Sequence, residues 1–268
     1  MNLSQLAFHQ PVLTLSELRR WLDQEGHSAN KCSREALLSY HLRQGRLLHV
    51  RRGLYAVVAP GSDPQTSPVD PYLIAAKMSE DAVLAYHTAL EVHGKAHSVF
   101  ERFFFQSNKL QRPTTFRRRY RFESVLFPKP LREKRKQFFA TKTLECSGVE
   151  IRVASLERTL VDVLDRPNLG GGWEEIWRSL ESVEYFDLDL VVAYTKLLNN
   201  RTTAAKVGYY LQQHAEALMV EDRHLAPLRK LRPRQPHYLQ RGQSGTLVRD
   251  WNLVIPPSLA QRDWEEVL

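Results

Sequence analysis

The sequence has few cysteines and no long apolar run. Its two cysteines, Cys32 and Cys146, lie far apart and neither belongs to a Cys-x-x-Cys pair, so a disulfide framework and a thiolate zinc site both lack support. No stretch reaches the roughly 18–20 uncharged apolar residues that a membrane helix needs. The first residues combine neither a basic leader nor a long apolar segment. We therefore expect a protein of the reducing cytoplasm with no membrane partner.

The composition is that of a folded protein. Hydrophobic residues make up 43% and charged residues 25% of the 268 residues, which is near the globular averages of about 45–50% and about 25%. Intrinsic disorder and fibrous architectures are therefore excluded. At roughly 100–200 residues per domain, the length predicts one large or two modest domains.

Basic and acidic segments alternate along the chain. The formal net charge is +8, yet residues 102–136 alone carry 12 basic and 2 acidic side chains, and residues 1–60 have a net charge of +4. Residues 61–101 and 137–220 each have a net charge of −4. Runs such as Arg117 to Arg121 are typical of a surface that contacts phosphates, because binding releases counterions from a polyanion. A solvated charged face explains the same runs without any ligand.

The first 60 residues have the order of a winged helix-turn-helix. A helix is predicted from Thr14, where Glu17 completes a capping box, and a second helix runs from about Ser33 to Gly45. Two strands then flank a short glycine-containing turn, at residues 47–50 and 54–58. A winged helix of this kind binds DNA or, alternatively, serves only for protein contacts.

The second predicted helix has two distinct faces. At 100° per residue, its apolar side and His41 point one way, and a small, polar and basic side points the other way. A recognition helix needs side chains that reach base edges, and a wing needs basic residues close to phosphates. The DNA-binding residues predicted in this module are Arg34, Ala36, Ser39, Tyr40, Arg43, Arg46, Arg51 and Arg52. A second basic region adds Arg117, Arg118, Arg119 and Arg121.

A loop rich in proline, glycine and serine at residues 59–68 marks the predicted domain boundary. We expect a DNA-binding domain at 1–62 and a C-terminal α/β domain at 63–268, in which 63–100 forms a helical connection. Helices are expected over 82–92 and 155–164, and apolar strands around 103–105 and 120–127. The predicted fold class is α+β: a winged helix-turn-helix followed by a larger mixed α/β domain.

Several segments resemble the AbiEi-type antitoxins of type IV toxin–antitoxin systems. The helix-to-wing segment Gln44-Gly45-Arg46-Leu47-Leu48-His49-Val50-Arg51-Arg52-Gly53-Leu54-Tyr55 is similar to the signature of that family. Further similar segments follow in the same order, so the resemblance covers most of the chain; they are Asp70–Ala76, Ala85–Gly94, Ser155–Asp162 and Gly171–Glu175. The basic block at 102–136 is not part of the signature.

The resemblance implies a repressor that binds inverted repeats in its own promoter and counteracts a nucleotidyltransferase toxin. In that family, the winged helix carries DNA binding, and the larger C-terminal domain supplies antitoxicity and adds to repression. Arg46, Arg51 and Arg52 match the family's basic helix-to-wing segment, whereas Ser39, Tyr40 and Arg43 rest on the helical periodicity alone. Antitoxicity through a stable complex with the toxin and antitoxicity without one both stay open, as do monomeric and dimeric binding to the operator.

Enzymatic chemistry has weak support, and we expect no catalytic residue, metal or cofactor. His87, His93 and His97 lack the spacing for a metal site on one helix, so we expect them to have structural roles. Glu150 and Arg152 faintly match one arm of a metal-dependent nuclease, whose partner aspartate is not assignable. A DNA-targeted nuclease is therefore the alternative function, although an alternating strand explains the same two residues.

Overall fold

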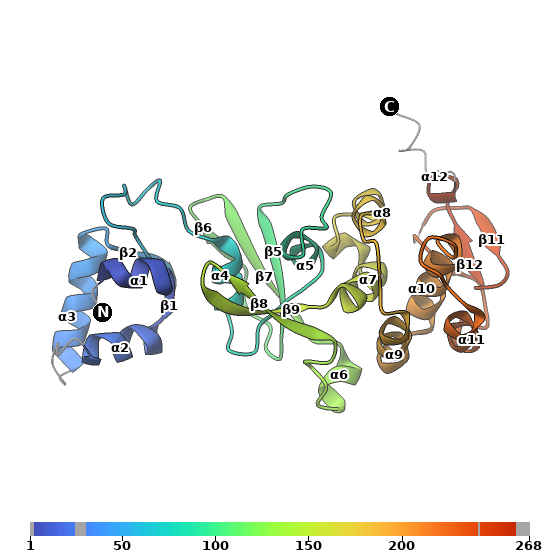
Figure 1. The fold of residues 1–268 in the computed structure, drawn as a ribbon, viewed down its shortest axis with the longest axis horizontal. Helices are drawn as coiled ribbons and strands as arrows, with labels where there is room; N and C mark the ends of the chain where they lie inside the picture. The colour runs from blue at the N-terminus through green and yellow to red at the C-terminus, as the bar shows by residue number, and fades with distance from the viewer. Residues whose placement is uncertain (1–2, 25–30, 241, 261–268) are drawn as a thin grey trace. The chain divides into compact units, whose positions relative to one another are not determined.

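The computed structural model describes residues 3–24, 31–240 and 242–260 of the chain. Helices and strands are mixed along its whole length, which confirms the α+β class (Figure 1). The chain folds into two compact units, each built from three separate stretches of sequence. Unit 1 comprises Met1–Leu84, Phe100–Leu126 and Thr143–Val153, and unit 2 comprises Ala85–Val99, Phe127–Lys142 and Ala154–Leu268.

Unit 1 begins with three helices that surround a small antiparallel sheet. In this sheet, β3 lies between β1 and β2. The N-terminal elements are α1 (Leu3–His9), β1 (Val12–Thr14), α2 (Leu15–Gln24), α3 (Lys31–Arg43), β2 (Leu47–Arg51) and β3 (Leu54–Val57).

Local sequence signals account for the ends of these elements. The Thr14 backbone N–H donates to Glu17 Oε2 at 2.7 Å, and the Glu17 N–H donates to Thr14 Oγ1 at 3.3 Å, so the predicted capping box is confirmed. Gly45 has a φ of +66°, the left-handed conformation that commonly ends a helix, directly after α3.

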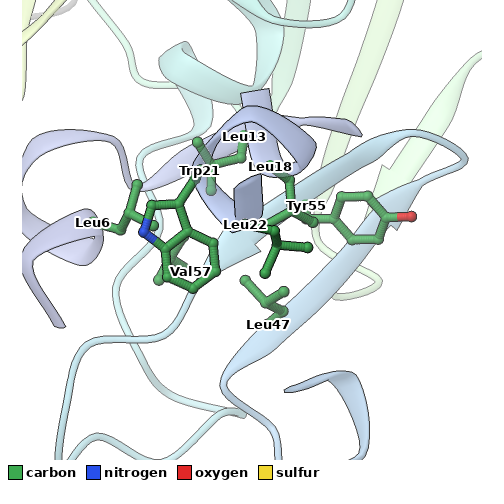
Figure 2. Packing of buried hydrophobic residues seen from close by; sticks show 8 residues of the cluster. All are labelled: Leu6, Leu13, Leu18, Trp21, Leu22, Leu47, Tyr55 and Val57. Carbon is green, nitrogen blue, oxygen red and sulfur yellow. The ribbon is translucent and has the colours of Figure 1, made fainter. Parts of the chain in front are cut away.

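A hydrophobic core holds the N-terminal elements together (Figure 2). Each helix and strand contributes apolar side chains at helical or alternating spacing, which removes them from water. The buried residues of the cluster are Leu6, Leu13, Leu18, Trp21, Leu22, Leu47, Tyr55 and Val57. Leu37, Leu38 and Leu42 of α3 pack against it.

A six-stranded mixed sheet follows, mostly within unit 1, with the strand order β6-β7-β5-β4-β9-β8. β5 and β7 are parallel, as are β4 and β9, whereas β4–β5 and β6–β7 are antiparallel. The strands are β4 (Val83–Leu84), β5 (Arg102–Ser107), β6 (Thr114–Phe116), β7 (Tyr120–Leu126), β8 (Thr141–Cys146) and β9 (Val149–Ala154). Three short helices accompany these strands, namely α4 (Pro71–Ala76), α5 (His87–Val92) and α6 (Lys129–Glu133).

The prediction of one helix over 82–92 is wrong in its first half. Val83 and Leu84 form β4, which pairs with β5 on one side and β9 on the other, and only His87–Val92 is helical. Tyr86, between the two elements, has a φ of 58° that breaks the helical path. A short apolar run that is buried on both faces has no alternation, so its pattern does not separate a strand from a buried helix.

The remainder of unit 2 is largely helical and ends in a small three-stranded sheet with the order β10-β12-β11. Its elements are α7 (Leu156–Asp165), the 3₁₀ helix η1 (Pro167–Leu169), α8 (Trp173–Glu181), α9 (Leu188–Leu198), α10 (Arg201–Gln213), α11 (Asp222–Leu231), β10 (His237–Tyr238), β11 (Thr246–Val248), β12 (Leu253–Ile255) and α12 (Pro257–Ala260). Among the described residues, no helix has the length and apolar character to cross a membrane.

Candidate nucleic-acid interface

The two faces predicted for α3 are confirmed by burial. His41 is buried, and the leucines on the same side pack against the N-terminal core. The opposite face is exposed and carries Ala36, Ser39, Tyr40 and Arg43. These side chains offer a hydroxyl, a phenol and a guanidinium, which are the groups that read base edges or contact phosphates. The helix therefore presents a small, polar and basic surface that the core does not use.

Two more predicted residues flank this face in different ways. Arg46 is exposed just beyond the end of α3, and its guanidinium lies 5.8 Å from the centre of the Tyr40 ring. Arg34, near the start of α3, is less accessible, because its Nη1 lies 3.1 Å from Asp23 Oδ2 on α2. The C-terminal half of α3 is thus the more open part of the basic surface.

The two arginines of the β2–β3 hairpin have different environments. Arg52 is exposed in the turn. Arg51 donates from its guanidinium to the Met78 carbonyl oxygen and to the Gln111 side-chain oxygen. Burial lowers the pKa of Arg51 below its ordinary value. The structure therefore revises the expectation for Arg51: its two terminal nitrogens are engaged within unit 1, and Arg52 is the arginine that the hairpin presents outward.

The partners that hold this hairpin were not predicted. Gln111 also donates from its backbone N–H to Ser124 Oγ at 2.6 Å, which fixes it beside β7. A separate ion pair joins the end of α4 to α2, since Lys77 Nζ lies 2.7 Å from Glu17 Oε1. Both Arg51–Gln111 and Glu17–Lys77 join residues that are 60 positions apart. No local spacing signals such pairs, so periodicity and turn patterns could not have found them.

In the second basic region, Arg117 is also engaged within the protein. Its two terminal nitrogens donate to the Ser67 carbonyl oxygen at 2.6 Å and to the Pro64 carbonyl oxygen at 2.8 Å. Both acceptors lie in the loop that precedes α4. The expectation that Arg117 contacts DNA is therefore revised, because its guanidinium fastens this loop to the β6–β7 hairpin.

The other three arginines of this block are exposed. Arg119 Nε lies 2.6 Å from Glu101 Oε1, and Arg121 Nε lies 2.6 Å from Glu123 Oε1. The hydrogen bond to Glu101 raises the pKa of Arg119. Exposed ion pairs of this kind contribute little to stability, but a phosphate must compete with the carboxylate for each of these two arginines. Arg118 lies between the paired residues at the tip of the hairpin.

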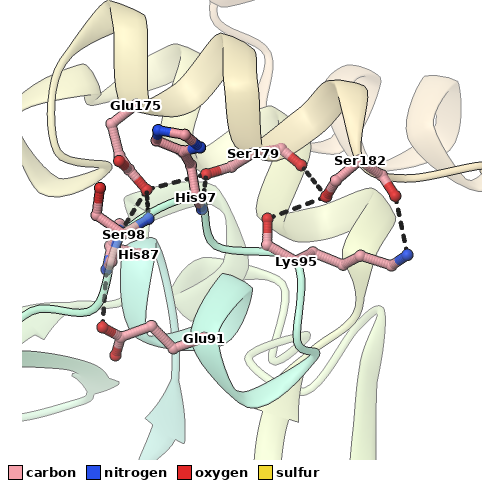
Figure 3. Close-up of polar contacts among 8 residues, drawn as sticks. All are labelled: His87, Glu91, Lys95, His97, Ser98, Glu175, Ser179 and Ser182. Carbon is pink, nitrogen blue, oxygen red and sulfur yellow. Dashed lines mark hydrogen bonds and ion pairs between the residues drawn. The ribbon is translucent and has the colours of Figure 1, made fainter.

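The histidines that could suggest a metal site are structural. His87 is fully buried, with Nε2 3.0 Å from Glu175 Oε1 and Nδ1 3.4 Å from Glu91 Oε1 (Figure 3). His93 Nε2 donates to the Ala154 carbonyl oxygen at 2.8 Å. The His97 backbone N–H donates to a serine hydroxyl of α8, also drawn in Figure 3. The rings of His87 and His93 thus join segments of unit 2, whereas His97 does so through its backbone N–H.

The residues of the nuclease alternative do not form a metal site with other described groups. Glu150 is exposed on β9, and burial alternates along this strand as expected for outward-facing charges. Within residues 3–24, 31–240 and 242–260, no group of three histidine, cysteine, aspartate or glutamate side chains could hold a metal ion.

Comparisons with known proteins bear on the fold. No family model matches the chain, and no curated protein matches it. Among solved structures, it is similar to the crystal structure of the RV2827C protein from Mycobacterium tuberculosis, with a TM-score of 0.56 and 19% sequence identity. The match covers 94% of this chain and 89% of that one. Both proteins therefore share an arrangement of elements over nearly their full lengths.

Proposed function

We propose that this chain is a DNA-binding transcriptional repressor of its own operon and the antitoxin of a type IV toxin–antitoxin system. The observation that carries the DNA-binding half is the exposed polar and basic face of α3, with Ser39, Tyr40 and Arg43, on a helix whose other face belongs to the core. A surface of this composition is what base and phosphate contacts require.

The N-terminal module supports a winged-helix assignment. Its described elements follow the order α1-β1-α2-α3-β2-β3, so that two consecutive helices precede β2 and β3, which form an antiparallel hairpin. In a helix-turn-helix protein the second helix of the motif enters the major groove, so α3 is the proposed recognition helix. The β2–β3 hairpin is the proposed wing, and Arg52 is its proposed phosphate contact.

The antitoxin half rests on the ordered segments that resemble AbiEi-type proteins. Unlike the wing segment, most of them lie beyond the N-terminal module, at 70–76, 85–94, 155–162 and 171–175. The proposed partners are therefore double-stranded DNA with an inverted repeat and a nucleotidyltransferase toxin, which the protein opposes directly or only functionally. The proposed site of action is the cytoplasm.

Operator binding tests the DNA-binding half. The full chain and duplexes from the region upstream of its own gene are compared by fluorescence anisotropy over a series of salt concentrations. Arg52→Ala should weaken binding to all duplexes and reduce the slope of log K against log salt by about 0.9. Arg43→Ala should instead change the preference between operator variants, by about 1–3 kcal/mol for a base-reading side chain.

Two results would contradict these assignments. Absence of binding by the wild-type chain at low salt would overturn the repressor function. Equal weakening of all duplexes by Arg43→Ala would make Arg43 a phosphate contact instead of a base contact. Arg51→Ala serves as the comparison, because its guanidinium is engaged within unit 1 and its loss should lower stability.

A further inference from the structure

The turn between β6 and β7 contains two arginines in an unfavourable backbone conformation. Arg117 has a φ of 51° and Arg118 a φ of 54°, and the Arg119 N–H donates to the Phe116 carbonyl oxygen at 3.1 Å. A hairpin turn with positive φ at both central positions strongly favours asparagine and glycine. The backbone conformation therefore does not explain why arginine occupies either position.

The side chain of Arg117 has an intramolecular role that offsets this cost, and that of Arg118 has none. Arg117 donates to two backbone carbonyl oxygens of the preceding loop, and Arg119 pairs with Glu101. Arg118 is exposed and, within the part of the chain that the structure describes, makes no hydrogen bond or ion pair. A strained residue that serves no contact of its own fold is a candidate for contact with a ligand.

This turn is fastened to the end of α3. Arg117 donates to the Pro64 carbonyl oxygen, and the Pro64 ring lies so close to Gly45 that a Cβ at Gly45 would come within 2.6 Å of it. Gly45 directly follows α3. The segment that leads into β6 is also tied to the β2–β3 hairpin, by the hydrogen bond from Arg51 to Gln111. The turn, the hairpin and the C-terminal end of α3 therefore belong to one braced structure.

We propose that Arg118 binds the phosphate backbone of duplex DNA beside the bases that α3 reads, so that the β6–β7 turn forms a second contact outside the winged helix. This inference rests on the proposed DNA-binding function. An exposed guanidinium with all its donors unused matches a phosphate oxygen in charge and geometry. The paired arginines on either side hold the turn and do not contact the DNA.

Arg118→Gly tests this assignment in the full chain, because glycine removes the guanidinium and also suits the positive φ. We expect the association constant K of the variant for the operator duplex to depend less steeply on salt, with the slope of log K against log salt reduced in magnitude by about 0.9. The ratio of the wild-type K to the variant K should therefore decrease about 3.5-fold between about 50 and about 200 mM salt. The melting temperature should rise by about 2–4 °C as the strain is relieved. Ethylation interference should show the loss of one phosphate contact.

Arg119→Ala is the matched control, because it removes an exposed arginine one residue away that already pairs with Glu101. Its slope of log K against log salt should equal that of the wild type. Arg118→Lys should also keep the wild-type slope, because lysine retains the positive charge. If the wild type binds the operator and Arg118→Gly leaves both slope and interference pattern unchanged, the second contact is overturned while the winged-helix function stands. If the wild type binds no duplex, the proposed function and this inference fail together.

Discussion

Arg158 places a guanidinium in the interior of unit 2. It is fully buried, and Nη1 donates to the Gln137 and Phe139 carbonyl oxygens at 2.8 and 2.7 Å. Its Nε lies 3.5 Å from Asp162 Oδ2, one turn along α7, and Asp162 also accepts a hydrogen bond from the Tyr194 hydroxyl at 2.7 Å. Arg158 and Asp162 stand at i and i+4 on α7, the spacing at which opposite charges meet on one face of a helix. Arg158, Asp162 and Tyr194 are all buried, so this pairing is part of the interior of unit 2.

Loss of Asp162 should therefore destabilise the fold strongly. Asp162→Ala leaves the buried charge of Arg158 without its counter-charge, which typically costs about 3–5 kcal/mol. Urea unfolding at neutral pH measures the change. Glu133→Ala, which breaks an exposed pair with Lys129 at 3.6 Å, is the control and should cost at most about 1 kcal/mol. A loss below about 1 kcal/mol for Asp162→Ala would show that water or a rearranged side chain compensates Arg158.

The exposed face of α3 could be predicted from the sequence, whereas the partners of individual arginines could not. The two faces of α3 could be predicted because a helix with one buried side has apolar residues at intervals of three and four along its sequence. The engagement of Arg51 and Arg117 could not be predicted, since their acceptors are three backbone carbonyl oxygens and one side-chain oxygen, all 27 to 60 positions away. Backbone acceptors carry no sequence signature at all. The net charge of a segment therefore does not distinguish arginines that are hydrogen-bonded within the protein from arginines that are exposed.

Among the elements of unit 2, α5, the loop after it and α8 meet at the Glu175 carboxylate (Figure 3). Oε1 accepts from the Ser98 backbone N–H at 3.0 Å and from Ser179 Oγ at 3.1 Å, and lies 3.0 Å from His87 Nε2. Burial alone raises the pKa of Glu175, but the hydrogen bonds from Ser98 and the interaction with His87 lower it below its ordinary value of 4.5. The ionised form is therefore the one that joins the three segments.

The depressed pKa of Glu175 predicts a pH-dependent contribution to stability. A carboxyl whose folded pKa lies below its unfolded pKa stabilises the fold above about pH 4.5, and this stabilisation is lost as the pH falls through the folded pKa. Glu175→Gln should lower the free energy of unfolding by about 1–3 kcal/mol at pH 7, and the difference from wild type should shrink below about pH 4.5. Urea titrations over this range measure it. Glu174→Gln, an exposed neighbour, should show little change at any pH, and a pH-independent gap for Glu175→Gln would contradict the assignment.

The start of a helix can be predicted where the residue directly before it caps the first turn with its side chain. The side chains of Asp70 and Ser155 accept backbone N–H groups at the starts of α4 and α7, respectively, the role that Asp and Ser commonly take directly before a helix. β4 was missed because its two residues pair with strands about 20 and about 70 positions later in the sequence, in β5 and β9. A strand that is completed by distant partners has no pattern of its own.

For the whole molecule, the net charge of +8 describes neither the strength nor the location of the basic surface. The region at 102–136 carries the largest formal excess, but several of its arginines pair with Glu101 and Glu123 or donate to carbonyl oxygens. The N-terminal segment has a smaller excess, and Arg43, Arg46 and Arg52 are all exposed there. Exposed basic side chains therefore lie on α3, on the hairpin and at the β6–β7 turn, and a further exposed group, Lys134 to Lys136, follows α6. The acidic segment at 137–220 lies mostly in unit 2.

If the chain is the repressor and antitoxin that we propose, this distribution predicts that the two functions are separable. The double variant Arg43→Ala, Arg52→Ala removes exposed cations from the N-terminal module and alters no buried residue, so unit 2 keeps its structure. Expressed from an independent promoter with the nucleotidyltransferase toxin, this variant should restore growth as well as wild type, while a reporter under the operator should be derepressed. Copurification with the toxin then distinguishes a stable complex from a functional antagonism. Loss of growth rescue in a variant that is folded and equally abundant would place antitoxicity on the DNA-binding surface and contradict the division of functions proposed for the chain.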